Sequence, residues 1–372
     1  MLINELPDDC LLTIFDYIQD LEDLINCFKV CEKWCNVIVG RTRRVKYLFD
    51  QTYYSPDCVG GYVDQPIDVT CLSKWFPNLR TVDLFFLLHG KVPIEDIVKL
   101  IRDSESLKGI IFPFNYYLDF ELIPEIASLE MLSTGSISIN ISGIYENVKQ
   151  LHLDMSNLYL CELAHYFPNL ERLHFYMKPG LSEPYSNAPV LANLKIIEMG
   201  MSHGYWEDGR CSFVFMDSCP ALQSAHIRFN NSSVEVNFSV KLVNLQDLVI
   251  EIHHSIELND LRRLMSKYPN LKHLALRNFS LKDEHIKQLI LILPKLTLLD
   301  IRKSYGVTQE AADHVRDYCK RYGRSIKIYF KKDDEQLETD WPEKICRGFD
   351  FMRHCFFNSF DDLPYFLDPI DD

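Results

Sequence analysis

Hydrophobic positions in the N-terminal part of the chain recur at helical spacing. Between Leu6 and Ile18 they follow an i, i+3, i+4, i+7 pattern, which predicts a helix with one apolar face. Asp20 is placed to cap a second helix that runs to Phe28, and a third helix contains Trp34. Three short helices bury little apolar surface on their own. We therefore expect this unit to dock onto another surface.

From residue 72 onward the hydrophobic pattern becomes a repeat. A phrase of the form apolar–Pro–x–Leu occurs at 76–79, 167–170, 219–222, 268–271 and 293–296. Each copy leads into a pattern close to L-x-x-L-x-L, and about ten units recur at a mean spacing of about 24 residues. Their first positions are Leu79, Leu107, Leu129, Val148, Leu170, Leu194, Leu222, Leu245, Leu271 and Leu296. One unit cannot cover its own inward-facing leucines, so such units stack into a solenoid.

The repeat predicts the fold class of residues 72–330. Each unit supplies one short strand, and helix-like spans such as 258–268 and 283–293 close the convex side. We therefore expect an α/β horseshoe of about ten turns in this range.

Side chains at positions 5 and 7 of each unit point away from the leucine core, because side chains alternate along a strand. Position 5 supplies His152, His174, Glu198 and His226 on successive strands, which should form a ladder on the concave face. Solvated surface histidines are the default interpretation, partner recognition is the alternative, and a zinc site is disfavoured. The candidate substrate-binding residues are His152, Asp154, His174, Tyr176, Glu198, His226, Arg228, Glu251, Arg277 and Arg302.

Three of these candidates are arginines near the C-terminal turns. The guanidinium groups of Arg228, Arg277 and Arg302 can bind carboxylates or a phosphorylated segment of a partner. An ordinary solvated arginine face explains them equally well.

Charge and composition narrow the range of partners. The formal net charge is −14, which argues against binding to nucleic acid or to an anionic membrane. No apolar run approaches the length of a membrane span, and the first residues lack the features of a secretion signal. We therefore expect the 12 cysteines to be free thiols in the cytosol or the nucleus. Cys27, Cys31 and Cys35 share a helical stripe and are interpreted as small buried hydrophobic residues rather than metal ligands.

Two further segments differ from their surroundings. Arg41, Arg43, Arg44 and Lys46 form a basic cluster, interpreted as a solvated helix end, with a nuclear import signal as the alternative. A turn-rich connector over residues 49–71 follows the cluster.

The C-terminal part of the chain combines acidic with aromatic residues. Residues 333–372 contain 12 acidic and 3 basic residues together with many phenylalanines. We expect residues 331–372 to form a tail or a cap on the last repeat. A sharper hypothesis is that 361–372 folds over the arginine-bearing end of the concave face and limits access to it.

The N-terminal residues also resemble a known family. The runs Leu6-Pro7-Asp8-Asp9, Ile14-Phe15, Asp20-Leu21-Glu22-Asp23-Leu24 and Val30-Cys31-Glu32-Lys33-Trp34 resemble, in order and spacing, an F-box. In that family the motif is a three-helix module that binds the adaptor of SCF-type cullin–RING ubiquitin ligases. The resemblance extends from residue 4 to about residue 45, and we expect the F-box domain to comprise residues 1–48. It implies an adaptor-binding set of Leu6, Pro7, Leu11, Ile14, Phe15, Leu24, Val30, Cys31 and Trp34.

A leading F-box and a trailing repeat array together resemble the F-box/leucine-rich-repeat subfamily. That resemblance implies a non-catalytic substrate receptor that binds the adaptor, and through it the cullin, while the repeats hold an unknown protein substrate for ubiquitination. Motifs of nucleotide-binding loops, serine hydrolases and zinc proteases are absent from the sequence, and no cofactor or metal is expected. The alternatives are a leucine-rich-repeat scaffold outside the ubiquitin pathway and a GTPase-activating horseshoe, which would need an arginine placed at its target's nucleotide.

Overall fold

The computed structural model describes most of the chain, in two compact units that are treated separately. The units are Met1–Lys149 and Gln150–Asp372. The described residues are 3–49, 57–60, 68–84, 93–112, 117–118, 124–137, 143–156, 160–177, 191–201, 211–229, 234–252, 257–331, 335–341 and 349–367.

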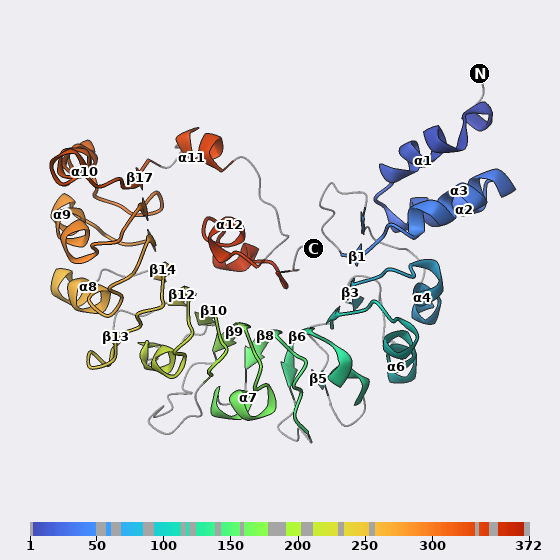
Figure 1. The fold of residues 1–372 in the computed structure, drawn as a ribbon, viewed down its shortest axis with the longest axis horizontal. Helices are drawn as coiled ribbons and strands as arrows, with labels where there is room; N and C mark the ends of the chain where they lie inside the picture. Colours follow the sequence, from blue (N-terminus) through green and yellow to red (C-terminus); the bar gives the residue numbers. More distant parts are fainter. Residues whose placement is uncertain are drawn as a thin grey trace. The chain divides into compact units, whose positions relative to one another are not determined.

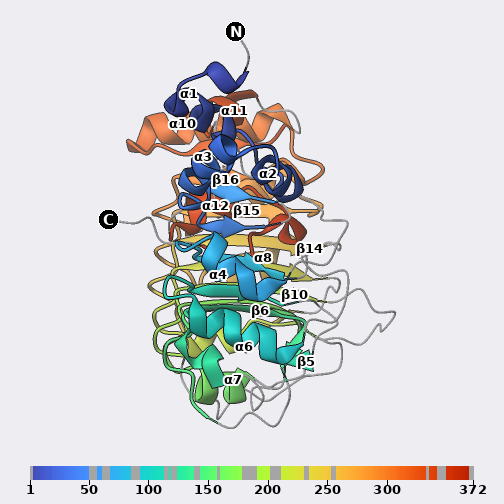
Figure 2. The same cartoon turned by 90° about the vertical axis from the view of Figure 1, so that its right-hand side faces the viewer.

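The first unit begins with the three expected helices (Figures 1 and 2). After a short 3-10 turn, η1 (Ile3–Glu5), they are α1 (Asp8–Asp16), α2 (Leu21–Phe28) and α3 (Glu32–Thr42). Asp20 Oδ1 accepts a hydrogen bond from the backbone N–H of Asp23 at 2.9 Å, so the predicted cap of the second helix is confirmed.

The rest of the first unit is a parallel sheet with helices between its strands. The strand order is β2 (Cys58–Val59), β1 (Tyr47–Leu48), β3 (Thr81–Asp83), β4 (Gly109–Ile111) and β6 (Met131–Thr134). The intervening helical elements are η2 (Val69–Cys71), α4 (Leu72–Trp75), α6 (Ile94–Asp103) and η3 (Pro124–Ser128). A second small sheet pairs β5 (Tyr117–Leu118) with β7 (Ser136–Ile137).

The second unit is a curved parallel sheet whose strands follow chain order. They are β8 (Gln150–Ser156), β9 (Arg172–Met177), β10 (Ile196–Met201), β12 (Ser224–Phe229), β14 (Asp247–Ile252), β15 (His273–Arg277), β16 (Leu298–Asp300) and β17 (Lys327–Tyr329). Outside them lie α7 (Leu160–Tyr166), η5 (Val214–Ser218), α8 (Leu258–Met265), α9 (Asp283–Ile292) and α10 (Gln309–Tyr322) (Figure 1). Elements β11 (Cys211–Ser212) and β13 (Val234–Glu235) form a separate pair.

The remaining elements of the second unit belong to its C-terminal part. They are α11 (Glu335–Asp340), α12 (Phe351–His354) and η6 (Phe360–Asp362). Figure 1 shows α12 on the inner side of the arc formed by the strands of this unit, opposite the outer helices.

The repeat predicted from the sequence is confirmed by burial. All ten first positions, from Leu79 to Leu296, are no more than 7% exposed. The predicted helices at 258–268 and 283–293 are present, although they end earlier, at Met265 and Ile292. The fold is a mixed α/β solenoid, as expected.

The asparagine that precedes the first leucine of a unit ties successive turns together. Its side-chain amide donates to a backbone carbonyl of the preceding turn at 2.7–3.4 Å. The pairs are Asn78 with Arg43, Asn147 with Ala127, Asn193 with Pro168, Asn244 with Pro220 and Asn270 with Val243. These bonds explain why asparagine recurs in the repeated phrase, since an exposed loop would otherwise leave those carbonyls to water.

The structure of the basic cluster at residues 41–46 differs from the expected solvated helix end. Arg41 is completely buried, and its guanidinium donates to the carbonyls of Phe15, Ile18 and Cys58 at 3.2–3.3 Å. Burial lowers the pKa of Arg41, although the nearby Asp16 opposes that shift. The interpretation as a solvated helix end is therefore wrong for Arg41, because its forked donors satisfy carbonyls at the end of α1 and in β2.

The structure also bears on the expectations for the cysteines and for membrane-spanning segments. Among the described residues, nine cysteines are free thiols, and Cys27, Cys31 and Cys35 are only partly buried rather than buried. None of the helices in the described part of the chain is both long and apolar enough to cross a membrane.

Candidate functional site

The interior of the three-helix module, α1 to α3, contains apolar side chains from each helix. Leu11 and Phe15 of α1, Leu24 of α2 and Ile38 of α3 are almost completely buried. The ring of Trp34 packs edge-on against Phe15, with the ring centroids 5.0 Å apart. Trp34 therefore fastens α3 to α1.

Side chains of α3 also hold the residues that precede α1. The indole N–H of Trp34 donates to Asn4 Oδ1 at 2.7 Å, and Lys33 Nζ donates to the carbonyl of Leu6 at 2.7 Å. The segment that carries the Leu6-Pro7 motif is thus fixed by polar contacts that the sequence pattern did not reveal.

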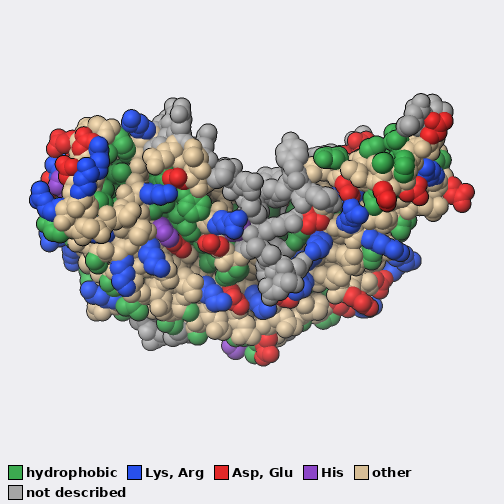
Figure 3. Space-filling view, turned by 45° about the horizontal axis from the view of Figure 1, so that its top comes forward, with side chains coloured by type: hydrophobic (Ala, Val, Ile, Leu, Met, Phe, Trp, Pro, Cys, Tyr) green, Lys and Arg blue, Asp and Glu red, His purple; other side chains and the backbone are tan. Residues whose placement is uncertain are grey.

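The module leaves several apolar side chains in solvent. Ile14 is 41% exposed, Val30 is 55% exposed and Tyr17 is 83% exposed. Figure 3 shows hydrophobic and acidic side chains mixed on these N-terminal helices. Exposed apolar groups on a small helical module are a common feature of protein-binding surfaces.

The nine residues assigned to adaptor binding by resemblance differ in exposure. Pro7, Ile14 and Val30 are exposed; Leu6, Cys31 and Trp34 are partly buried; Leu11, Phe15 and Leu24 are buried. The buried three can affect an adaptor only through the shape of the module. Tyr17, the 83% exposed residue that directly follows α1, was not in the predicted set. Its position three residues after Ile14 in the helical pattern is the signal that would have included it.

The concave face of the second unit carries the ladder predicted from position 5. The strand register places His152 beside His174, His174 beside Glu198, and Glu198 beside His226. The rings of His152 and His174 stack with centroids 4.2 Å apart. The ladder is therefore confirmed. Among the described residues, no group of three metal-binding side chains is arranged to hold a metal ion.

One half of the ladder is built around a buried carboxylate. Arg172 Nη2 donates to both oxygens of Glu198, at 2.9 and 2.7 Å, and His174 Nδ1 lies 3.0 Å from Glu198 Oε2. Burial raises the pKa of Glu198, but Arg172 and His174 outweigh it and bring the pKa to about 2. Glu198 is therefore ionised and fully paired at neutral pH.

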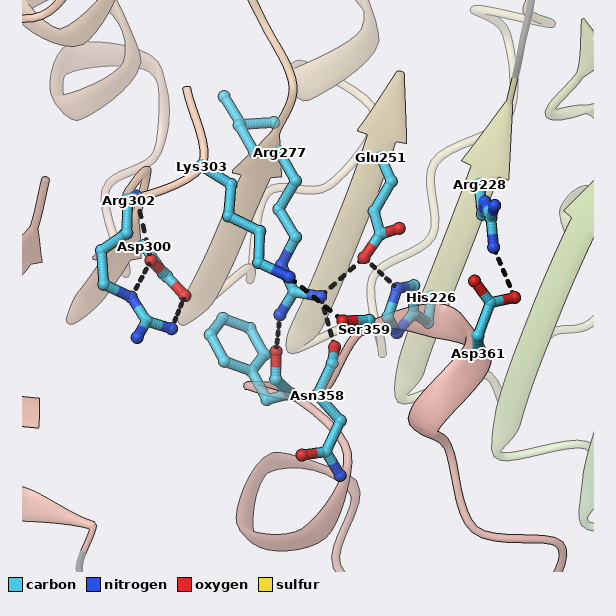
Figure 4. A network of polar contacts seen from close by, with 12 residues as sticks. His226, Arg228, Glu251, Arg277, Asp300, Arg302, Lys303, Asn358, Ser359 and Asp361 are labelled. Carbon is cyan, nitrogen blue, oxygen red and sulfur yellow. Dashed lines mark hydrogen bonds and ion pairs between the residues drawn. The ribbon is translucent and has the colours of Figure 1, made fainter. Parts of the chain in front are cut away.

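A second carboxylate on the concave face has the same arrangement. Glu251 Oε1 accepts from Arg277 Nη1 at 2.6 Å and lies 3.2 Å from His226 Nε2 (Figure 4). Burial raises the pKa of Glu251, but the bonds with His226 and Arg277 outweigh it and bring the pKa to about 2. Arg302 forms a separate pair with Asp300, at 2.8 Å.

The C-terminal segment, residues 349–367, lies on this concave face. Phe351, Phe356, Phe360 and Leu367 are buried in one cluster with Val249 and with other apolar side chains of the strands. Each of these side chains contributes on the order of 2 kcal/mol to the stability of the fold when it is removed from water. Three of the four are phenylalanines, and their burial explains why the tail is rich in aromatic residues.

Polar contacts also fix the C-terminal segment to the strands. Arg277 donates to the carbonyls of Phe356, at 2.5 Å, and Asn358. Arg172 donates to the carbonyls of Pro364, at 2.7 Å, and Tyr365, at 3.2 Å. Gln150 forms two bonds with the backbone of Leu367, accepting from its N–H at 2.8 Å and donating to its carbonyl at 2.5 Å.

One acidic side chain of the segment forms the contact expected at the arginine-bearing end. Asp361 Oδ1 accepts from Arg228 Nη1 at 2.6 Å and from the hydroxyl of Tyr176 at 2.8 Å (Figure 4 shows the Arg228 contact). Burial raises the pKa of Asp361, but its bonds with Arg228 and Tyr176 outweigh this and lower it. Residues 368–372, the end of the acidic stretch, lie outside the described residues, and the limiting of access stays a prediction.

The ten substrate-binding candidates lie together on one surface, but most are not open to solvent. His152, His174 and His226 are at most 5% exposed, and each has an aromatic ring of the C-terminal segment within 5.4 Å, centroid to centroid. The expectation of solvated surface histidines is wrong, because a repeat pattern cannot show which distant segment covers its face. Whether the ten residues bind a substrate stays a prediction.

Sequence reasoning missed three polar residues of this surface. Gln150 and Arg172 stand at position 3 of their units, two residues before the ladder, and alternation along the strand puts them on the same face. Lys303, whose ammonium donates to Ser359 Oγ at 3.1 Å, was also missed. Extending the alternation one step further back would have found Gln150 and Arg172.

Acidification is expected to destabilise the second unit. Burial lowers the pKa of His152 and His226 in the fold, so below pH 6.5 the unfolded chain binds more protons at these two residues than the folded chain does. Their contribution to the free energy of unfolding is therefore complete above pH 6.5 and declines as the pH falls below 6.5. Glu198 and Glu251, with pKa values near 2 against 4.5 when unpaired, add a further loss between about pH 4.5 and 2. Each proton taken up on unfolding changes the free energy of unfolding by about 1.4 kcal/mol per pH unit.

Denaturant midpoints at pH 7.5 and pH 5.5 measure the histidine part of this effect. His226→Gln keeps a donor for Glu251 but does not titrate, so its loss of stability over this interval should be smaller than that of the native chain. Equal midpoints at the two pH values for the native chain would show that His152 and His226 do not stay neutral in the fold.

Comparison with known proteins agrees with the N-terminal geometry. The model of the F-box-like family matches residues 3–43. None of the curated proteins searched matches the sequence.

Solved structures give a fold-level comparison. The leucine-rich-repeat domain of APL1 is 12% identical, with 77% of this chain and 80% of that one covered and a TM-score of 0.35. An internalin from Listeria monocytogenes is 12% identical, with 79% and 92% covered and a TM-score of 0.35. A chain of the Rad7 and Elc1 complex in yeast is 14% identical, with 88% and 94% covered and a TM-score of 0.33.

Fold and site together define the class of the molecule: a three-helix module with exposed apolar side chains, followed by an α/β repeat solenoid. More particularly, residues 3–43 match the F-box-like family, and the strands and helices that follow them form the repeat solenoid.

Proposed function

We propose that this chain is the substrate-recognition subunit of an SCF-type cullin–RING ubiquitin ligase. The F-box-like domain would bind the adaptor, and through it the cullin, while the repeats would hold a protein for ubiquitination in the cytosol or nucleus. The observation that supports this most directly is the match of residues 3–43 to the F-box-like family, in a module whose Ile14, Tyr17 and Val30 are solvent-exposed.

The chain would contribute proximity rather than chemistry. Holding a target next to a recruited conjugating enzyme replaces a bimolecular encounter with a local one, which raises the effective concentration of the target. No residue of this chain is assigned a catalytic role in this proposal.

A double substitution on the exposed face tests adaptor binding. Ile14→Asp with Val30→Asp should abolish capture of the SCF adaptor and cullin in a co-purification experiment, because each change puts a charge into an apolar contact. Both side chains are already in solvent, so the thermal unfolding of the chain should be nearly unchanged.

Leu291→Asp supplies the matched control. Leu291 is a large apolar residue on α9 that is 57% exposed, so it receives the same charge at similar exposure but away from the module. This variant should retain the adaptor. Capture of the adaptor by the Ile14→Asp, Val30→Asp chain would contradict the proposal, and failure of the native chain to capture it would favour a repeat scaffold outside the ubiquitin pathway.

A further inference from the structure

The contacts of the C-terminal segment resemble those of a bound peptide. Three strand residues, Gln150, Arg172 and Arg277, bond to its backbone rather than to its side chains. Bonds to main-chain groups position a segment on a surface without requiring a particular sequence. The same three residues would serve any segment that followed this path.

Two side chains of the segment are recognised individually. The ring of Phe360 lies against the rings of His174, Tyr176 and His226, with centroids 4.8–5.4 Å apart. Gly200 leaves the space for it, because a Cβ atom there would stand 2.7 Å from the Phe360 ring. Asp361, the next residue, is held between Arg228 and Tyr176.

The two arginines keep charged partners without the segment. Arg172 keeps its bidentate bonds to Glu198, and Arg277 keeps its bond to Glu251, so departure of the segment leaves neither charge unpaired. The Asp361 side chain is 62% exposed, and ion pairs this open to solvent are weak. The guanidinium groups of Arg172 and Arg277 are thus positioned by the repeats themselves.

We propose that this face binds a segment of a partner protein in which an aromatic residue is followed directly by Asp or Glu in a helical turn like η6, and that the chain's own C-terminal segment is an internal competitor for that site. The inference rests on the proposed function, because it names the kind of segment that a substrate would present. A tethered competitor acts at an effective concentration on the order of millimolar, so a partner segment must bind well to displace it.

A labelled peptide with the sequence of residues 356–367 tests the proposal by fluorescence anisotropy. The receptor is the full chain with a specific protease site inserted within residues 342–348, measured before and after cleavage. Cleavage converts the tethered competitor into a dissociable one, and peptide affinity should rise at least tenfold. A full chain carrying Phe360→Ala, uncut, provides a second way to weaken the competitor and should also bind the peptide more tightly than the native chain.

Matched peptides test the aromatic–acidic pair. Asp361→Asn in the peptide should weaken binding to the cleaved chain severalfold, whereas Asp362→Asn should leave it unchanged, because Asp362 is exposed and its side chain is not part of the contact with Arg228. Arg228→Gln in the receptor should remove the difference between the Asp361→Asn peptide and the native peptide.

The outcomes separate this inference from the proposed function. No peptide binding to the cleaved, folded chain or to the Phe360→Ala chain, or equal effects of Asp361→Asn and Asp362→Asn, would show that the segment is a permanent cap and overturn the inference. The peptide assay contains no adaptor, and the Ile14→Asp, Val30→Asp chain should bind the peptide normally. Adaptor capture without peptide binding would therefore reject only the inference, and peptide binding without adaptor capture would reject only the ligase role.

Discussion

Replacing Arg172 by Met is expected to lower the free energy of unfolding by about 3–5 kcal/mol. Arg172 is 1% exposed, and its partner Glu198 is completely buried. The substitution removes the strongest stabilising charge beside Glu198 and also frees two carbonyls of the C-terminal segment. Because a buried carboxylate without its partner costs far more than the pair contributes, chemical denaturation of the variant should show a large loss.

Two further variants make this prediction specific. Lys195→Met breaks the ion pair with Glu171, which has the same 2.7 Å separation but a lysine side chain that is 41% exposed, so the loss should be at most about 1 kcal/mol. Adding Glu198→Gln to Arg172→Met removes the orphaned charge and should recover a large part of the stability. If Arg172→Met and Lys195→Met lose similar amounts, the buried pair is not what holds this face together.

Replacing Phe15 by Ala should destabilise the three-helix module by about 3–5 kcal/mol. The ring is 1% exposed and packs against Trp34, so its removal leaves a cavity between α1 and α3 that helices this short cannot easily close. The expected readouts are an earlier unfolding transition of the first unit and a loss of adaptor capture caused by unfolding.

Ile14→Ala, one residue earlier on the same helix, is the comparison. Ile14 is exposed, so this change should leave the unfolding transition within about 0.5 kcal/mol and weaken adaptor capture directly. Stability and capture should therefore change together at Phe15 and separately at Ile14. A stable Phe15→Ala chain would contradict the assignment of this ring to the core of the module.

The features predicted correctly from the sequence are those set by local periodicity. Helical spacing and the cap at Asp20 located α2, and the repeat placed all ten inward positions, from Leu79 to Leu296, in the core. The same alternation along the strands predicts the ladder of His152, His174, Glu198 and His226 that the strand register confirms. Local patterns suffice here because a strand or helix buries the same face along its whole length.

The features missed depend on contacts between distant parts of the chain. Nothing near Arg41 in the sequence shows that its guanidinium reaches the carbonyl of Cys58, and nothing near His226 shows that Phe360 lies on it. The excess of aromatic residues in the tail indicated that the tail is buried, but not where. Arg172 is a different case. The alternation along the strand already places it on the concave face, but the candidates come only from positions 5 and 7 of each unit, and Arg172 stands at position 3.

The path of the C-terminal segment also changes how the second unit should unfold. In a repeat array each turn touches only its neighbours, so opening can begin at an end and spread turn by turn. Here a single segment bonds to β8 through Gln150, to β9 through Arg172 and to β15 through Arg277, with 217 residues separating Gln150 from Leu367. Because the segment bonds to β8, β9 and β15, opening of one of these strands must break contacts that the segment shares with the others. Hydrogen exchange in β8 and β15 should therefore report one cooperative opening. Release of the segment should replace that single opening by separate openings of the individual strands.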